Sequence, residues 1–228
     1  MIIVFIGTVA AGKSTHKKLL GQYFKSRGVR FRTLNIAALG GLSKIIQLLS
    51  KKWLIQLERN SSWVAFKVRM MLLADIIWIS AFNLPLLFIM DKILRCTLII
   101  EDYFITSIMD YLYVTSKWYR AKYRSNKLCY SRSMITRISI SLSIRMLRIF
   151  PIRLLIFMDA KDNELEKRQK ARGTFEVPDY VKFRRAVLSK LLSIVDSGLI
   201  LRIDTSNRSI TDVHLEIVKA LTSLGMSL

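Results

Sequence analysis

The segment with the clearest chemical meaning lies near the N-terminus and reads Gly7-Thr8-Val9-Ala10-Ala11-Gly12-Lys13-Ser14. It fits the pattern G-x-x-x-x-G-K-[ST], in which glycines let successive backbone N–H groups turn toward phosphate oxygens. Lys13 would reach the β- and γ-phosphates of a nucleotide, and the Ser14 hydroxyl would ligate Mg²⁺. The alternative is an ordinary glycine turn that caps a helix. We predict that this segment binds ATP together with Mg²⁺.

The elements on either side of this loop favour the nucleotide-binding interpretation. The continuous apolar run Ile2–Ile6 predicts a strand covered on both faces, and Ser14–Arg27 has the pattern of a helix. The remaining chain alternates between the two kinds of element. Further strands are predicted over Phe31–Ile36, Thr97–Ile100, Ile152–Met158 and Leu199–Ile203, and further helices over Leu42–Leu57, Trp63–Leu94, Tyr103–Arg124, Lys161–Arg172, Tyr180–Val195 and Thr211–Leu224.

Strands that alternate with helices form parallel sheets with crossover helices on both faces. We therefore predict an α/β fold of the P-loop NTPase type, with three α/β/α layers and a five-stranded parallel sheet. Ile2–Ile6 is expected at the centre, between Thr97–Ile100 and Ile152–Met158. No internal repeat, low-complexity tract or linker is visible, so the whole range 1–228 is predicted to be a single domain.

Two acids follow the predicted strand Thr97–Ile100, next to the strand that precedes the loop. A carboxylate at the place of Glu101 can bind the water of a metal ion or orient an acceptor. Glu101 is therefore a candidate metal and catalytic residue beside Ser14. For Asp102, the N-cap of the helix that follows is the alternative.

The balance of charge is strongly positive, with 37 Lys and Arg against 16 Asp and Glu and a formal net charge of +21. Such a charge attracts phosphates, nucleic acid and anionic membranes, but it does not determine a fold. Part of it lies between Lys117 and Arg153, where no acid occurs, and a solvated basic helix face is the favoured interpretation. The sequence contains no recognisable nucleic-acid-binding module, so nucleic acid is disfavoured as a partner.

The cysteines and the apolar segments indicate in which cellular compartment the protein is expected. Two cysteines without metal-ligand spacing are typical of a reducing cytoplasm, and no basic residue precedes the first apolar run, so a signal peptide is not predicted. Met70–Met90 is long enough to span a bilayer, but it contains Asp75, Asn83 and Pro85. A buried helix is favoured for this segment, and a membrane span stays open as the alternative.

Motifs along nearly the whole chain resemble the thymidylate kinase family of P-loop nucleoside and nucleotide kinases. Gly12-Lys13-Ser14-Thr15 resembles the end of the family's phosphate loop, and Glu101-Asp102-Tyr103 its Asp-Arg-Tyr segment. Lys167–Gly173 resembles its basic lid, and Leu201–Ser206 its last strand and adenine loop. The resemblance also implies a helix over Ile138–Ile144, although ISISLSI alternates like a strand.

What this resemblance implies is phosphoryl transfer from ATP to a nucleoside monophosphate, with dTMP to dTDP as the best match. It places a lid at about 161–178, where Arg168 and Arg172, with Lys170, would clamp the transferring phosphoryl group. Thr205 and Ser206 would contact adenine, and Thr15 would extend the phosphate loop. A solvated basic helix for the lid and a plain turn for the adenine loop are the alternatives.

The acceptor side departs from the family pattern. Asp102 stands where the family has the arginine of Asp-Arg-Tyr, and Ala37–Gly41 replaces the Arg-Glu-Pro-Gly-Gly loop. Ala74-Asp75-Ile76 also lacks an arginine, while Asp110 is a further candidate for contact with the acceptor. Two other functions therefore stay open: an ATP-binding protein with a different acceptor or none, and an ATPase at a membrane or on nucleic acid. Homodimerisation also stays open.

Overall fold

The computed structural model describes residues 1–35, 84–102, 152–173, 178–192 and 200–225, with isolated positions within 70–82 and 134–141. The chain divides into two compact units. The first consists of Met1–Ile36, Leu87–Tyr103 and Phe150–Leu228, and the second of Ala37–Leu86 and Phe104–Ile149. Nearly all described residues belong to the first unit. The single domain over 1–228 stays a prediction.

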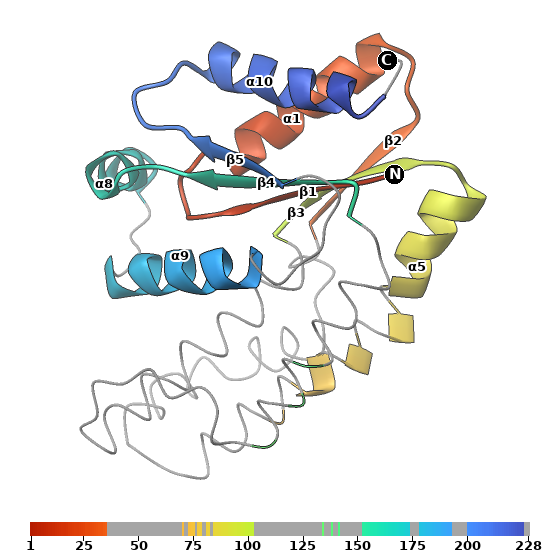
Figure 1. The fold of residues 1–228 in the computed structure, drawn as a ribbon, viewed down its shortest axis with the longest axis horizontal. Coiled ribbons are helices and arrows are strands. Elements are labelled where there is room, and N and C mark those ends of the chain that lie inside the picture. Colours follow the sequence, from red (N-terminus) through yellow and green to blue (C-terminus); the bar gives the residue numbers. More distant parts are fainter. Residues whose placement is uncertain are drawn as a thin grey trace. The chain divides into compact units, whose positions relative to one another are not determined.

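A five-stranded, entirely parallel sheet forms the centre of the first unit (Figure 1). The strand order is β2-β3-β1-β4-β5, so that β1 is central between β3 and β4. The class, the number of strands and this central position confirm the prediction. The strands are β1 (Ile2–Gly7), β2 (Phe31–Asn35), β3 (Thr97–Glu101), β4 (Leu154–Asp159) and β5 (Ile200–Asp204).

Helices cover both faces of this sheet and complete the three layers. The helices α1 (Lys13–Ser26) and α10 (Ile210–Ser223) lie on one face, and α9 (Pro178–Leu192) lies on the other (Figure 1). A fourth helix, α8 (Asp162–Ala171), follows β4. With a glycine-rich loop between β1 and α1, this arrangement is the fold of a P-loop NTPase.

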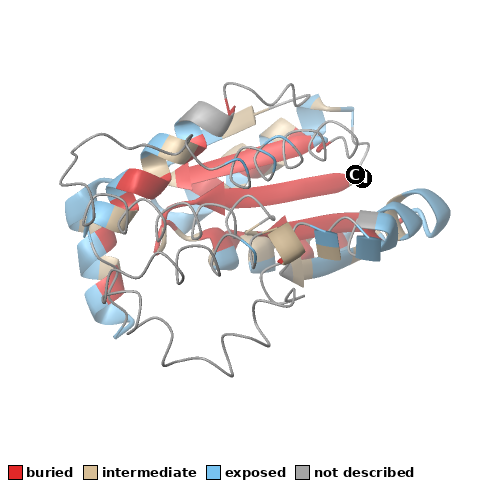
Figure 2. Cartoon of the chain, turned by 90° about the horizontal axis from the view of Figure 1, so that it is seen from below, coloured by how far each residue is buried: buried red, intermediate tan, exposed pale blue. Residues whose placement is uncertain are grey.

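The burial of the strands follows from their composition. Every residue of β1 is buried, as are Thr97–Glu101 of β3, and Figure 2 shows the strands as a buried band between more exposed helices. In α10 the residues Val213, Ile217 and Leu221 are buried at a spacing of four and pack into the same core as β1. Fully burying one such aliphatic side chain stabilises the fold by about 1.5–3 kcal/mol.

Two short helical elements precede β3. The helix α5 (Leu84–Phe88), which contains Pro85, is followed directly by a π-helical turn (Ile89–Ile93). The N–H of Leu94 donates to the carbonyl of Ile89 at 3.0 Å, which closes that turn. Among the described residues, no helix has the length and apolar character needed to cross a membrane.

Candidate functional site

The loop between β1 and α1 is shaped by the strand beside it. Gly7 has φ 143, and a Cβ atom at this position would overlap the backbone carbonyl of Met158 in β4, so only glycine fits. Gly12, at φ 96, precedes the first turn of α1. Between them, the hydroxyl of the buried Thr8 donates to Asp159 Oδ1 at 2.8 Å, which ties the loop to the end of β4.

The first turn of α1 is prepared for an anion. No side chain caps this helix end, and no acid lies in its first turn. The N–H groups there and the positive end of the helix dipole therefore face the loop without a competing carboxylate on the helix. This arrangement is the anion-binding geometry that the sequence predicts for residues 7–14.

The predicted lysine lies over this loop. Lys13 is only 6% exposed, and its Nζ donates to the carbonyl oxygens of Thr8 at 2.8 Å and Gly7 at 3.2 Å. The same Nζ is 3.9 Å from Asp102 Oδ1. The ammonium group thus lies at the mouth of the loop, where a phosphate would replace backbone carbonyls as its partner.

Ser14 and Glu101, both predicted to hold the metal ion, are in direct contact: the Ser14 hydroxyl donates to Glu101 Oε1. Lys17, one turn further along α1, places its Nζ 2.5 Å from Glu101 Oε2. Burial raises the pKa of Glu101, but the hydrogen bonds from Lys17 and Ser14 and the charge of Lys13 outweigh it, so the net pKa lies below the ordinary value. The carboxylate is therefore ionised at neutral pH.

A hydroxyl and an ionised carboxylate side by side are the oxygen donors that Mg²⁺ prefers. The donor set therefore fits the ion that the sequence predicts. Within the described ranges, no cluster of three or more His, Cys, Asp or Glu side chains could hold a metal ion alone. A magnesium ion at Ser14 and Glu101 would therefore complete its shell with water and with the phosphates of a nucleotide, as is usual for this ion.

One buried arginine at this edge of the sheet was not found from the sequence. Arg184 of α9 is 4% exposed and donates through Nη2 to Asp102 Oδ1 at 2.9 Å. Asp102 has φ 52, in the left-handed region, and lies between the guanidinium group and Lys13. Its alternative role as a helix N-cap depends on residues from 103 onward, which lie outside the described residues.

Asp159, at the end of β4, is a second acid held by an arginine of α9. Arg185 donates to Asp159 Oδ2 at 2.5 Å and to Oδ1 at 3.1 Å, and the Asp159 carboxylate raises the pKa of Arg185. Because Thr8 donates to the same carboxylate, α9 supports the phosphate loop through Asp159. Nothing in the sequence pattern pointed to this contact.

A cavity of about 160 Å³ adjoins the phosphate loop on the side of α8 and α10. Arg168 donates to the hydroxyl of Thr205 at 2.9 Å and to its carbonyl at 2.8 Å. Thr205 is itself buried, with its hydroxyl 3.3 Å from the carbonyl of Ala11. The cavity is lined by residues of the phosphate loop, the start of α1, α8 with the residue after it, and the segment from the end of β5 into α10. They include Ala10, Ala11, Gly12, Thr15, Arg168, Arg172, Thr205 and Arg208.

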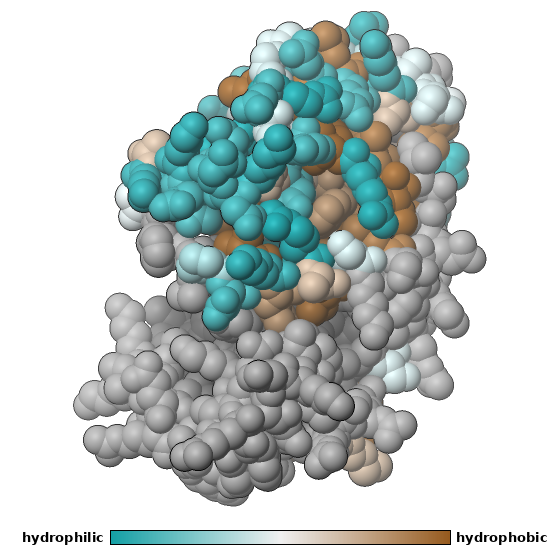
Figure 3. Space-filling view, turned by 60° about the vertical axis from the view of Figure 1, so that its left-hand side comes forward, coloured by the Kyte–Doolittle hydropathy of each residue, from teal (hydrophilic) through white to brown (hydrophobic). Residues whose placement is uncertain are grey.

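The structure therefore brings together most of the candidate residues. Residues 7–15, Glu101, Arg168, Arg172 and Thr205 lie at the carboxyl end of the sheet, whereas Ser206 instead accepts a hydrogen bond from the N–H of Lys161 at 2.7 Å. Hydrophilic side chains gather at the α8 end of the described part (Figure 3). Asp110, Ala37–Gly41 and most of Lys117–Arg153 lie outside the described residues. Ile138 and Ser141 are helical, as the resemblance implied.

Comparison with known proteins finds similarity in structure alone. No protein-family model matches the chain, and no curated protein matches it. A solved structure resembles it. Thymidylate kinase from Ehrlichia chaffeensis shares 15% sequence identity with a TM-score of 0.47, and the alignment covers 97% of this chain and 98% of that one. The assignment of the fold rests on the strand order and the phosphate loop described above.

Proposed function

We propose that this protein transfers the γ-phosphoryl group of ATP to a nucleoside monophosphate, with dTMP to dTDP as the best guess. The observation that carries the proposal is the joint arrangement of the phosphate loop, Lys13 and the Ser14–Glu101 pair at one edge of the sheet. A phosphoryl transferase needs these parts, because its catalysis consists of positioning and of charge neutralisation.

Each of these residues has a definite role in the proposal. Lys13 moves from the carbonyls of Gly7 and Thr8 to the β- and γ-phosphates, and the loop N–H groups hold their oxygens. Ser14 and Glu101 hold Mg²⁺, which neutralises charge on the phosphates when bound. An oxygen of the acceptor phosphate then bonds to the γ-phosphorus, the bond to the β–γ bridging oxygen breaks, and ADP leaves.

The cavity beside the loop is proposed to hold the adenine of ATP. Its volume of about 160 Å³ suits a single base, and it opens beside the loop that would hold the phosphates. Arg168 fixes one wall through Thr205, while the exposed Arg172 lines the same cavity and has no ion-pair partner within the described part of the chain. We expect Arg172 to be the more mobile of the two lid arginines and the one that reaches the γ-phosphoryl group.

A second function is favoured by one specific contact. Asp102 occupies the place at which the resembling kinases have an acceptor-binding arginine, and here its carboxylate binds Arg184 and lies near Lys13. Asp102 offers no positive charge to an acceptor phosphate, and the Arg184 guanidinium group beside it is already engaged by this carboxylate. The second candidate is therefore an ATP-binding protein with a different acceptor or none.

One experiment separates the two functions. The protein is incubated with ATP·Mg²⁺ and with single nucleosides or nucleoside monophosphates, while ADP and the phosphorylated acceptor are both quantified. The proposal predicts equal amounts of ADP and of a nucleoside diphosphate, and no product from the Lys13→Ala variant. ADP release that is the same with every acceptor, or ATP binding without any release, would support the second function instead.

A further inference from the structure

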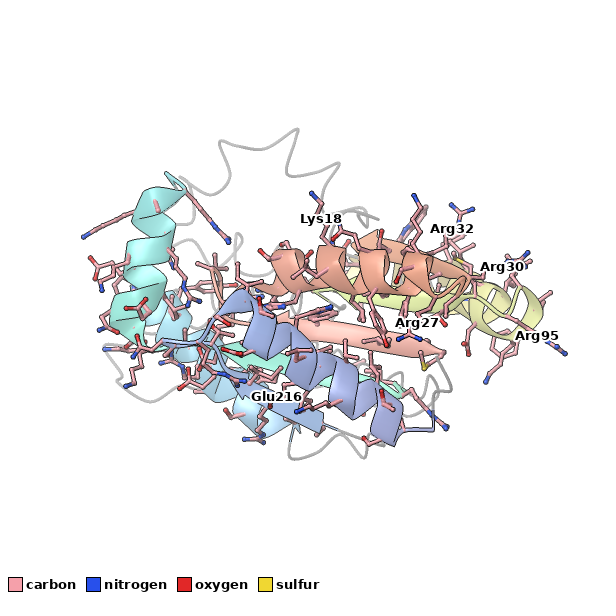
Figure 4. The ribbon with its side chains drawn as sticks, turned by 90° about the horizontal axis from the view of Figure 1, so that it is seen from above. Lys18, Arg27, Arg30, Arg32, Arg95 and Glu216 are labelled. Atoms are coloured by element: carbon pink, nitrogen blue, oxygen red, sulfur yellow. The ribbon has the colours of Figure 1, made fainter. Side chains whose placement is uncertain are left out.

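The amino end of the sheet carries a surface that the proposed function does not use. We call it the basic face, and it extends from α1 across the start of β2 to the residue before β3. Figure 4 shows Arg30, Arg32 and Arg95 gathered at this end, beside the helical segment that precedes β3. All of its side chains are exposed: Lys25, Arg27, Arg30, Arg32 and Arg95.

The electrostatic feature of the basic face is a group of neighbouring cations without acidic partners among the described residues. None of them forms an ion pair within the described residues, although Arg27 lies 5.6 Å from the ring centre of Tyr23. By contrast, Arg208 pairs with Glu216 of α10 at 2.6 Å. Glu216 is labelled in Figure 4, apart from Arg30, Arg32 and Arg95. A group of like charges without counter-charges raises the local positive potential and attracts a polyanionic surface.

An apolar ridge adjoins the basic face. It consists of Phe88, Ile89, Ile93 and Leu94, on the end of α5 and on the π-helical turn, and Ile93 is 66% and Leu94 50% exposed. The acid within this stretch, Asp91, is already paired with Lys92 at 3.4 Å. The ridge therefore offers large aliphatic side chains to solvent without adding a free negative charge.

A groove joins the two features into one surface. Its volume is about 570 Å³, and Arg30 and Arg32 line it on one side, with Met90 and Leu94 on the other. Cations and exposed aliphatic groups thus meet along a common border. This combination is what an interfacial membrane-binding surface contains, because cations attract lipid headgroups while apolar side chains enter the boundary of the acyl chains.

We propose that the basic face and the apolar ridge together dock the protein on a bilayer rich in anionic phospholipid. The exposed ridge favours a bilayer over nucleic acid, because phosphate backbones attract cations but offer no apolar layer for Ile93 and Leu94. The phosphate loop lies at the opposite end of the sheet. Arg95 and Glu101 are separated by the length of β3, about 17 Å at 3.3 Å per residue, so the docked protein keeps its loop open to solution.

The test is sedimentation with vesicles, using the full chain. Wild-type protein should sediment with vesicles of equal parts phosphatidylcholine and phosphatidylglycerol, and stay in solution with phosphatidylcholine alone. Binding should fall at least about tenfold between about 0.1 M and about 1 M salt, because the Debye length falls from about 10 Å to 3 Å. Absence of binding to the anionic vesicles overturns the proposal.

Matched variants locate the surface. The triple variant Arg30→Gln, Arg32→Gln, Arg95→Gln should bind at least about tenfold more weakly, since each cation near an anionic surface contributes separately. The control triple Lys182→Gln, Arg202→Gln, Lys219→Gln removes the same charge from exposed positions on α9, β5 and α10 and should bind like the wild type. Equal losses in both triples would show a general effect of charge and would contradict the assignment.

A third variant separates the bilayer from nucleic acid. Ile93→Ser with Leu94→Ser keeps every cation, and it should reduce vesicle binding while leaving retention on an oligonucleotide unchanged. Thermal unfolding and ATP binding serve as controls that each variant is folded. If the serine variant binds vesicles as the wild type does, the apolar ridge has no part in docking and the bilayer assignment is wrong.

Discussion

The two ends of the parallel sheet carry opposite arrangements of charge. At the carboxyl end, buried or half-buried cations are matched to acids: Lys17 to Glu101, Arg184 to Asp102 and Arg185 to Asp159. At the amino end, the cations of the basic face have no such partners among the described residues. Paired charges hold side chains in fixed positions around a site, whereas unpaired ones attract a partner from solution. The cations described at the two ends of the sheet therefore have different electrostatic surroundings.

The largest expected effect comes from the lysine of the phosphate loop. Lys13→Ala should reduce turnover of ATP about 10³-fold, because one preorganised cation at the transferring phosphoryl group is worth several kcal/mol. The matched control is Lys25→Ala, which removes an exposed lysine of the basic face from the last turn of the same helix and should leave turnover unchanged. Steady-state ADP release measures both. Equal effects would remove the functional distinction between the two ends of the sheet.

The second-largest effect on turnover is expected at the two lid arginines. Arg172→Ala should lower kcat about 10²-fold with little change in KM, because a lid cation that reaches the γ-phosphoryl group acts on the transition state. Arg168→Ala should lower kcat less than Arg172→Ala does and should raise KM for ATP, since Arg168 holds Thr205 in the wall of the proposed adenine cavity. Initial rates over a range of ATP concentrations separate the two effects. Turnover like that of the wild type in both variants would leave the lid as a charged surface helix.

Breaking one of the ion pairs at the carboxyl end of the sheet should destabilise the fold, although neither partner of the pair is expected to contact ATP. Arg185→Gln leaves the Asp159 carboxylate without its bidentate partner and should lower the free energy of unfolding by about 1–3 kcal/mol. Lys167→Gln removes an exposed cation paired with Glu164 and should change stability by less than about 0.5 kcal/mol. Urea denaturation followed by circular dichroism compares the two. A larger effect at Lys167 would contradict the role given to the carboxyl-end pairs.

The pH dependence of stability tests the burial of His16 on α1. Burial, together with the charge of His214, lowers the pKa of His16 from 6.5 to about 4. The unfolded chain therefore takes up a proton near pH 6.5 that the folded chain takes up only near pH 4, so stability is full above 6.5 and falls as the pH drops toward 4. The His16→Gln variant should lose part of this slope in denaturation curves measured across that window. An unchanged slope would mean that the pKa of His16 is not lowered in the fold.

The smallest effect is expected at the basic face itself. The double variant Arg30→Gln, Arg32→Gln should have a free energy of unfolding within about 0.5 kcal/mol of the wild type. Any change at low salt should be stabilising, because the substitutions remove repulsion between neighbouring cations. Thermal unfolding at two salt concentrations measures this. A clear loss of stability would show that these arginines have structural partners, and the contrast between the two ends would then weaken.

The sequence predicted the parts that local pattern determines. The apolar runs located β1, β3 and β4, since a strand buried on both faces must be apolar nearly throughout, and the glycine and lysine spacing located the phosphate loop. It could not predict partners that the fold brings together from distant positions. Arg184 and Asp102 are 82 residues apart, and nothing in either segment indicates the other. The basic face was missed for the same reason, because it is assembled from separate segments.

The conformation of Gly7 affects how variants of this protein should be interpreted. The backbone of β4 excludes any side chain there, so Gly7 is required by the sheet whether or not a nucleotide ever binds. A variant that no longer bound phosphate would still need this glycine in order to fold, while the side chain of Lys13, which contacts only carbonyl oxygens of the loop and the Asp102 carboxylate, could be replaced more easily. In related sequences, a lysine kept at this position would therefore indicate a phosphate site that is still in use. A glycine kept at position 7 would indicate only that the fold is kept.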